Sequence, residues 1–333
     1  MRAIQIRTLE GPAAVVPAEV PEPDAADRVI VDVAFAGVSF PELLQTKGEY
    51  QIKPELPFVP GSEVAGVVRS APAGAPVRPG DRVAAFPGIG GFAETVAVMP
   101  YAVFPLPGSA SLQAAAALPM NYFTVHFALT RRSRLREGQT VLVQGAAGGV
   151  GTAAVQLARL LGARVIAVTS SPEKGEAARA AGAHEVVDAG DFRAQVASLT
   201  GGRGVDLVVD PVGGDRFTDS LRSLAPEGQL LVLGFAAGEI PTVKVNRLLL
   251  NNIAVVGVGW GAFWSRNPDY LQEQWRDLYP MLESGRLDPL LGATYPLEAA
   301  AQALAELDER RARGKILLSV AGDSAQGSDP GRA

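Results

Sequence analysis

A glycine-rich segment between a strand-like run and a helix-like run constrains the fold of this chain more than any other feature. The segment Gly145–Gly151 follows the apolar run Thr140–Gln144 and leads into small and apolar residues that end at Leu161. Glycines in such a turn let the backbone approach a phosphate and let the helix pack against the strand. The first N–H groups of the helix then favour an anion. We therefore predict a dinucleotide-binding turn. The alternative is a turn that serves packing alone, since Ala146 stands where the first glycine of G-x-G-x-x-G is usual.

Strand-like and helix-like runs alternate through the rest of this region. The predicted strands after the turn span 164–169, 185–188, 205–210, 229–234 and 255–258, and the predicted helices span 151–161, 172–181, 191–199 and 217–224. Alternation with this spacing predicts a parallel sheet with helices on both faces, as in a Rossmann-type doubly wound α/β fold.

The two ends of the chain have a different texture. Short apolar runs separated by Pro and Gly fill residues 1–110, which predicts a compact antiparallel barrel or sandwich. After two predicted helices at 270–284 and 298–311, a last strand at 315–320 is expected to return to this first domain. Residues 321–333 are small and polar, which predicts a disordered tail.

The side chains available to the chain restrict its chemistry. It has no cysteine and two histidines, His126 and His184. A thiolate nucleophile, a disulfide and a zinc site with sulfur ligands are therefore excluded. We interpret both histidines as structural, so a bound cofactor has to supply the chemistry.

Charge and hydropathy exclude some classes of partner. The chain has 30 basic and 35 acidic residues, a net charge of -5, and no basic block, so neither nucleic acid nor an anionic membrane is expected. It has no apolar run long enough to span a bilayer, and its first residues lack the sections of a signal peptide. We expect a cytoplasmic protein whose partner is a small molecule.

The end of the second strand of the sheet indicates which dinucleotide is bound. NAD-binding proteins carry Asp or Glu there, and the carboxylate holds the ribose 2′-OH. Here the strand ends in Thr169, Ser170 and Ser171, and Lys174 follows one helical turn later. Hydroxyls and an ammonium suit a 2′-phosphate, so the predicted cofactor is NADPH. Ser170 or Ser171 also fits a cap of the next helix, with Glu173 as its partner, and the two roles are compatible.

Two later turns are expected at the same edge of the sheet. Asp210 ends the fourth strand, and Leu233–Phe235 ends the fifth. Ligands of open α/β sheets lie beyond the carboxyl ends of the strands, so both turns are predicted to border the nicotinamide half of the site. We interpret Asp210 itself as a structural cap. The aromatic segment Gly257–Trp264, with Trp260 and Trp264, either roofs an apolar substrate pocket or forms a subunit contact.

Motifs along nearly the whole chain carry a family resemblance. They are Gly37–Leu44, Leu56–Gly66, Gly80–Val83, Ala147–Gly151 and Gly314–Ile316. From its N-terminus to about Val320, the chain resembles the medium-chain dehydrogenase/reductase superfamily, and within it the zinc-free quinone oxidoreductase (zeta-crystallin-like) branch. The resemblance implies a GroES-like β-barrel catalytic domain at 1–118 and 262–320, an inserted Rossmann NADPH-binding domain at 119–261, and a homodimer.

The resemblance also implies a site that works without a metal. Zinc-dependent relatives place Cys where this chain has Ser39, and His where it has Ser62 before the retained Glu63. Zinc-free relatives commonly carry Asn at the position of Ser39, whereas serine offers one hydroxyl that can donate a hydrogen bond to a substrate oxygen. Tyr50 matches the tyrosine that lines the cleft, and Thr124 matches a segment near the nicotinamide. The predicted catalytic residues are Ser39, Tyr50 and Thr124, with packing roles open for the last two.

The predicted cofactor-binding residues come from the glycine turn, the end of the second strand, the turn after the fifth strand and the last motif. They are Gly145, Ala147, Gly148, Gly149, Val150, Gly151, Thr169, Ser170, Ser171, Lys174, Gly234, Phe235 and Lys315.

The expected reaction is hydride transfer from NADPH to a quinone or an activated enone, with both rings oriented by the protein. An enoyl-thioester reductase of the acryloyl-CoA kind is the alternative within the enzymes, and Lys47, Lys53 and Arg266 are the basic candidates to hold its CoA. A non-catalytic, crystallin-like NADPH-binding protein is the alternative from another class.

Overall fold

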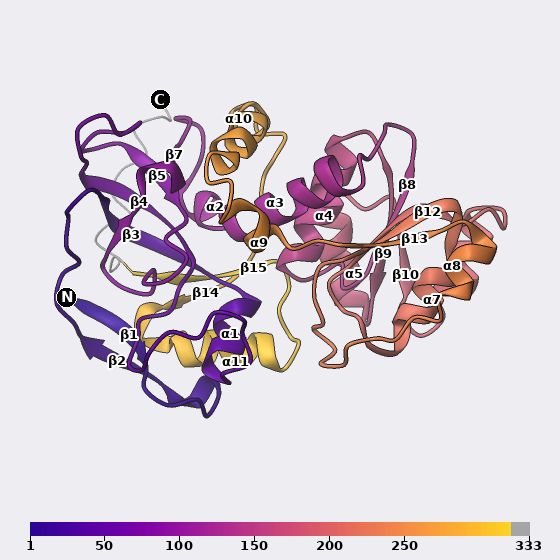
Figure 1. The fold of residues 1–333 in the computed structure, drawn as a ribbon, viewed down its shortest axis with the longest axis horizontal. Helices are drawn as coiled ribbons and strands as arrows, with labels where there is room; N and C mark the ends of the chain where they lie inside the picture. The colour runs from indigo at the N-terminus through magenta and orange to yellow at the C-terminus, as the bar shows by residue number, and fades with distance from the viewer. Residues whose placement is uncertain (321–333) are drawn as a thin grey trace. The chain divides into compact units, whose positions relative to one another are not determined.

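The structure, a computed structural model, describes residues 1–320 and consists of two compact units (Figure 1). Unit 1 comprises Met1–Met120 and the described part of Leu291–Ala333, and unit 2 comprises Asn121–Leu290. The predicted tail 321–333 lies outside the described residues. Among the helices of the described chain, none is long and apolar enough to cross a membrane, and a cytoplasmic location stays a prediction.

Unit 1 is built on a seven-stranded sheet with the strand order β14-β15-β3-β4-β5-β7, in which β6 also pairs with β3. Its strands are β3 (Val29–Val38), β4 (Glu63–Ser70), β5 (Arg82–Ala85), β6 (Thr95–Val98), β7 (Val103–Pro105), β14 (Leu291–Pro296) and β15 (Lys315–Ser319). A separate pair consists of β1 (Arg2–Ile6) and β2 (Val15–Glu19), and the helices are α1 (Phe40–Thr46), α2 (Leu112–Ala116) and α11 (Ala300–Asp308).

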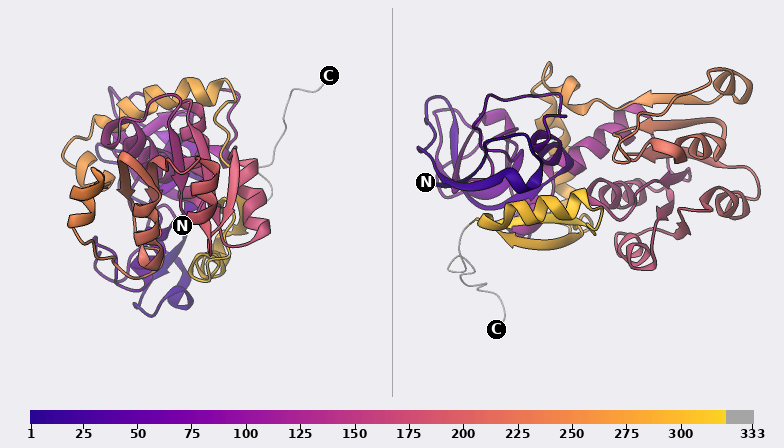
Figure 2. Two further views of the ribbon diagram at one scale, coloured as in Figure 1. Left: turned by 90° about the vertical axis from the view of Figure 1, so that its right-hand side faces the viewer. Right: turned by 90° about the horizontal axis from the view of Figure 1, so that it is seen from below.

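The strand closest to the C-terminus completes this sheet. β15 pairs antiparallel with β3, with Ile316 opposite Val38 and Leu317 opposite Gly37. Figure 2 shows the yellow C-terminal elements beside the indigo N-terminal strands of the same unit. The predicted return of the last strand to the first domain is thereby confirmed.

Unit 2 contains a six-stranded parallel sheet with the order β10-β9-β8-β11-β12-β13. The strands are β8 (Thr140–Val143), β9 (Arg164–Thr169), β10 (Glu185–Asp188), β11 (Val205–Asp210), β12 (Leu224–Val232) and β13 (Ala254–Gly257). The connecting helices are α4 (Gly149–Leu160), α5 (Pro172–Ala180), α6 (Phe192–Leu199), α7 (Phe217–Arg222) and α8 (Asn246–Asn251). The chain starts in the middle of the sheet, runs to one edge and then fills the other, which confirms the predicted doubly wound sheet.

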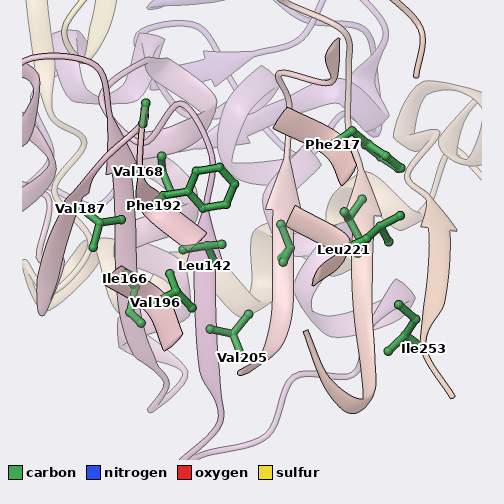
Figure 3. Packing of buried hydrophobic residues seen from close by; sticks show 13 residues of the cluster. Leu142, Ile166, Val168, Val187, Phe192, Val196, Val205, Phe217, Leu221 and Ile253 are labelled. Carbon is green, nitrogen blue, oxygen red and sulfur yellow. The ribbon is translucent and has the colours of Figure 1, made fainter. Parts of the chain in front are cut away.

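The core of this sheet explains why its strands read as apolar runs. Leu142 and Ile166, on the neighbouring strands β8 and β9, pack with Phe192 of α6 and Phe217 of α7 (Figure 3). These side chains are almost completely buried. A parallel sheet with helices on both faces leaves neither face to water, so apolar residues succeed one another instead of alternating with polar ones.

The boundary after the sheet differs from the predicted one. Residues 262–290 pack with unit 2, because α10 (Tyr270–Glu283) lies against α3 (Pro119–His126). Gln274 Nε2 donates to the carbonyl of Phe123 at 2.7 Å, and Gln274 Oε1 accepts from Trp260 Nε1 at 2.8 Å. Trp260, on α9 (Trp260–Trp264), is buried, and its ring packs edge to face against that of Phe123 with the ring centroids 6.1 Å apart. The unit therefore ends at Leu290, and Trp260 belongs to its core.

Candidate active site

The turn between β8 and α4 has glycines with two different functions. Gly145 adopts a left-handed φ of 58°, and a Cβ on Gly151 would lie 2.2 Å from the carbonyl oxygen of Gly145. Gly151 is therefore required by packing inside the turn. Gly148, the N-cap of α4, has an extended backbone, and a Cβ there would find its nearest atom, Gly145 O, at 3.7 Å. The protein itself leaves the space beside Gly148 open.

That open space lies at the start of a helix. Ala147 precedes the N-cap, and Gly149 and Val150 form the first turn of α4, whose N–H groups have no partner within a helix. These groups and the helix dipole favour a phosphate. The residues present therefore fit the pyrophosphate of a dinucleotide.

The end of β9 lies next to this turn, because the N–H of Ala146 donates to Val168 O at 3.2 Å. Ser171 caps α5 by accepting from the Lys174 N–H at 3.3 Å. Lys174 Nζ donates to Ser170 Oγ at 3.3 Å on the exposed surface. The cap interpretation is thus confirmed for Ser171, while binding of a 2′-phosphate by Ser170 and Lys174 stays a prediction.

The turns after β11 and β12 are close to each other. Asp210 is buried, and its Oδ1 accepts from the N–H groups of Val212 at 2.8 Å and Gly213 at 2.9 Å. Burial raises the pKa of this carboxyl, and the two N–H donors partly offset the rise. A Cβ on Gly213 would lie 3.1 Å from the ring of Phe235, which follows Gly234 and is partly exposed. Asp210 is therefore a turn cap, as interpreted from the sequence.

In unit 1, Ser39 and Ser62 meet at a buried carboxylate. Ser39 is the N-cap of α1 and directly follows β3, and its N–H donates to Glu42 Oε2 at 2.9 Å. Glu42 Oε1 accepts from the Ser62 N–H at 2.9 Å and from its hydroxyl at 2.6 Å. Burial raises the pKa of Glu42, while the hydrogen bond from Ser62 and the charge of Lys315 lower it.

A second buried carboxylate, Glu63, holds a lysine beside Ser39. Lys315 Nζ donates to Glu63 Oε1 and, at 2.5 Å, to Ser39 Oγ. The Ser39 hydroxyl donates to Glu63 Oε1 at 3.0 Å, and the Met120 N–H donates to Glu63 Oε2 at 2.8 Å. Lys315 is 3% exposed and Glu63 0%. Lys315, which the sequence predicts to bind the cofactor, therefore has its hydrogen-bond partners inside unit 1.

The sequence did not predict this network, which we call the Ser39 network (Ser39, Glu42, Ser62, Glu63 and Lys315). The sequence marks Glu63 only as a residue shared with the zinc-dependent relatives, and it gives no role to Glu42. The available signal was the spacing Ser39-x-x-Glu42, which is a helix capping box. The contact with Lys315 depends on the register of β15 against β3, which places residue 316 opposite Val38.

The other two predicted catalytic residues belong to different units. Tyr50 follows α1 in unit 1 and is partly buried; burial and the charge of Glu42 raise the pKa of its phenol. Thr124 lies on α3 in unit 2. The neighbouring Tyr122 ties this helix to α4, since its hydroxyl donates to Gln156 Oε1 at 2.8 Å. Tyr50 therefore lies near the Ser39 network, and Thr124 lies on a helix in contact with the one that follows the glycine turn.

Two family matches define the class of protein. Residues 25–108 match the family described as an alcohol dehydrogenase GroES-like domain. Residues 149–284 match the family described as a zinc-binding dehydrogenase. With the two sheets described above, these matches define a dehydrogenase/reductase that combines a GroES-like domain with a Rossmann-type domain.

Individual relatives narrow this class. Quinone oxidoreductase-like protein 2 of Bos taurus is 38% identical over 304 residues, which cover 90% of this chain and 87% of that protein. A probable oxidoreductase from Mycobacterium abscessus is 47% identical with a TM-score of 0.88, covering 96% of this chain and 99% of that one. The quinone oxidoreductase of Thermus thermophilus, also solved in complex with NADPH, is 36% identical with a TM-score of 0.83, covering 96% and 100%. The chain belongs to the quinone oxidoreductase branch of the medium-chain dehydrogenase/reductase superfamily, which confirms the predicted family and fold class.

Zinc, which the description of one family implies, does not fit the residues of this chain. Ser39 and Ser62 offer neutral hydroxyls in place of the thiolate and imidazole of the zinc-dependent relatives, and the chain has no cysteine. The ammonium of Lys315 contacts Ser39 and would repel a cation there. Across residues 1–320, no cluster of three or more His, Cys, Asp or Glu is arranged to hold a metal ion.

Proposed function

We propose that this oxidoreductase reduces a quinone or an activated enone with NADPH and without a metal ion. The observation that carries the proposal is the contact between Lys174 and Ser170 beside the glycine turn. It presents an ammonium and hydroxyls where NAD-binding proteins carry a carboxylate. The relative from Thermus thermophilus, solved with NADPH, supports the same cofactor.

The residues that would hold NADPH lie along one edge of the sheet of unit 2. The N–H groups at the start of α4 would hold the pyrophosphate, for which the backbone at Gly148 leaves space. Ser170 and Lys174 would hold the 2′-phosphate, since an ammonium forms strong hydrogen bonds with phosphate. Gly234 and Phe235 would border the nicotinamide.

The Ser39 network would serve the acceptor. Bound NADPH supplies a hydride from its nicotinamide ring. In this proposal, the Ser39 hydroxyl donates a hydrogen bond to the oxygen of the acceptor, and Tyr50 of the same unit lines the space around it. Within unit 2, Thr124 serves the nicotinamide. The carboxyl groups of the network accept hydrogen bonds within unit 1, so water supplies the proton that completes the reduction.

The test is a steady-state assay of NADPH oxidation by the purified full chain. We expect turnover with quinones and enones, little with NADH in place of NADPH, and no loss of activity in EDTA. Turnover with enoyl-CoA substrates alone would support the enoyl-thioester reductase. NADPH binding without turnover of any acceptor would support the crystallin-like role and refute the proposed reaction.

We also propose that the protein is a homodimer formed through the free edge of β13. In the strand order of unit 2, β13 pairs with β12 and ends the sheet. The preceding segment exposes large apolar side chains: Ile240, Val245, Leu249 and Leu250 are each more than two thirds exposed. An edge strand that follows a segment of exposed apolar side chains offers a surface that another chain can cover. A second copy can pair with the same edge around a two-fold axis.

Light scattering after size exclusion tests the homodimer. The wild type should have the mass of two chains, and a double variant, Leu249→Lys with Leu250→Lys, should have the mass of one. A matched control is Leu9→Lys, since Leu9 is an exposed leucine of unit 1, outside this surface. A monomeric wild type would refute the homodimer without affecting the proposed reaction.

A further inference from the structure

We propose that Lys315 and Glu63 are positioning residues that hold the Ser39 hydroxyl ready to stabilise negative charge on the acceptor oxygen. The ammonium of Lys315 then supplies, through Ser39, the positive charge that a metal ion supplies in the zinc-dependent relatives. This inference rests on the proposed function, and it gives Lys315 a different role from the cofactor contact expected from the sequence.

The hydrogen bonds around Ser39 determine where its hydroxyl hydrogen can point. A serine hydroxyl has one hydrogen to donate and two lone pairs to accept with. Lys315 Nζ donates to Ser39 Oγ and occupies one lone pair. The hydrogen of Ser39 is therefore directed away from Lys315, toward Glu63 Oε1 at 3.0 Å or toward a ligand. The lysine thus fixes Ser39 as a donor.

Glu63 in turn fixes the lysine. A buried lysine needs a partner, because an unpaired charge in the protein interior is strongly unfavourable. Glu63 Oε1 accepts from Lys315, and Glu63 Oε2 accepts from the backbone N–H of Met120. Both oxygens of the carboxylate are therefore held, and Lys315 keeps a partner when the Ser39 hydrogen turns to the acceptor.

The ammonium of Lys315, in contact with Ser39, favours negative charge on a ligand atom next to the Ser39 hydroxyl. When the hydride reaches the acceptor, negative charge develops on the acceptor oxygen. A hydroxyl with an ammonium behind it is a stronger donor to such an oxygen than a hydroxyl alone. Lys315 keeps its proton in this step: the hydride carries two electrons to the acceptor, and a proton from water neutralises the resulting anion. No bond to the protein forms or breaks.

The experiment compares Lys315→Met with Arg69→Met in the full-length protein. Arg69 is a matched control, because it also forms an ion pair between strands of unit 1, with Asp32 at 2.6 Å between β4 and β3, but on the surface. For each variant we would measure kcat, KM for a quinone, and the Kd of NADPH by its fluorescence. Removing one donor to an oxyanion typically lowers kcat by about 10²-fold.

We expect Lys315→Met to lower kcat by about 10²-fold while the Kd of NADPH stays within about twofold, and Arg69→Met to leave all three values unchanged. Ser39→Ala should lower kcat similarly, and combining it with Lys315→Met should cause no further loss, since both changes remove one interaction. A merely structural role of Lys315 would make the two losses independent of each other.

Chemical rescue gives a further readout that folding alone would not change. Because the chain has no cysteine, Lys315→Cys introduces a single thiol. Aminoethylation of that thiol in urea, followed by refolding, restores an ammonium at nearly the length of lysine, and kcat should recover. The wild type taken through the same steps is the control.

Several results would overturn the inference. An unchanged kcat in Lys315→Met would do so, and so would a raised Kd of NADPH with kcat retained, which would return Lys315 to the cofactor. If Lys315→Met does not fold, the pair Lys315→Met with Glu63→Gln removes both buried charges; this variant should fold and keep the low kcat, and wild-type kcat in it would refute the role. Absence of turnover in the wild type would instead refute the proposed function, and the inference with it.

Discussion

Two of the glycines in the β8–α4 turn, Gly148 and Gly151, allow cofactor binding and folding to be tested separately, because one added methyl group meets open space at the first and backbone at the second. In Gly148→Ala the added Cβ meets no protein atom closer than 3.7 Å, and the backbone there, with φ −79° and ψ 175°, is open to alanine. Alanine at a compatible position stabilises a protein by about 0.4–1 kcal/mol through the unfolded chain. Glycine is the better N-cap, so the two effects largely cancel. We expect the free energy of unfolding to change by less than about 0.5 kcal/mol.

Binding of NADPH should respond quite differently. The same methyl occupies the space through which a pyrophosphate would approach the start of α4, and a phosphate pushed outward loses its N–H donors. Loss of a single hydrogen bond to a charged group corresponds to about 1.5–3 kcal/mol. We therefore expect the Kd of NADPH to rise by about tenfold or more. Fluorescence titration with NADPH gives the Kd, and urea unfolding gives the stability.

The control for this pair is Gly151→Ala. Its Cβ would lie 2.2 Å from Gly145 O and 2.7 Å from the Cα of Ala146, both of them backbone atoms that cannot turn aside. Overpacking of this kind costs about 1–3 kcal/mol or more, so this variant should lose stability as well as cofactor. Wild-type NADPH affinity in a folded Gly148→Ala protein would show that the pyrophosphate binds elsewhere. Wild-type stability of Gly151→Ala would refute the packing role.

Two further predictions concern charged groups of unit 2. Lys174→Met combined with Ser170→Ala should raise the Kd of NADPH by about tenfold and leave that of NADH unchanged, because only NADPH has the 2′-phosphate; a parallel rise for both cofactors would contradict this assignment. Burial lowers the pKa of His126 below its ordinary value of 6.5, and the Asp277 carboxylate 3.2 Å away opposes the shift. As the pH falls, His126 is therefore protonated in the unfolded chain at a higher pH than in the folded protein. The contribution of neutral His126 to the free energy of unfolding is therefore fully present above pH 6.5 and is lost as the pH falls below that value. Urea unfolding at pH 8 and about pH 5 should show a larger loss in the wild type than in His126→Gln, and equal losses would refute it.

Apart from the return of the last strand to unit 1, the parts of the fold that the sequence predicted are those determined locally. The glycine turn, the strand before it and the helix after it are contiguous, so their residues carry the pattern without reference to the rest of the chain. The end of unit 2 at Leu290 is not determined locally, because α10 packs on α3 through Gln274 and Phe123, which are 151 residues apart. A helix with one apolar face indicates that it packs, but not on which partner.

The same reason separates the contacts that the sequence predicted from those that it missed. Ser170, Ser171 and Lys174 lie within five consecutive positions of one strand–helix junction, and their contacts follow from local geometry. Lys315 is 276 residues from Ser39 and 252 from Glu63. Nothing near Lys315 in the sequence indicates that it is buried, since an isolated lysine on a strand is most often exposed.

The Ser39 network bears on which acceptors this enzyme can reduce. A divalent metal ion withdraws electron density from a carbonyl directly, which suffices for the reduction of simple ketones and aldehydes. A hydroxyl supported by an ammonium provides one hydrogen bond to the same oxygen, and its contribution is of the order of 2.7–4 kcal/mol to the barrier. The rest of the stabilisation of this negative charge has to come from the acceptor itself, which must already be electron-poor. Quinones and enones meet this condition, because the negative charge that follows hydride transfer is delocalised over a conjugated system. Simple ketones of the same size should therefore bind with similar KM but turn over far more slowly, and comparable kcat for a quinone and a simple ketone would contradict the assignment of Lys315.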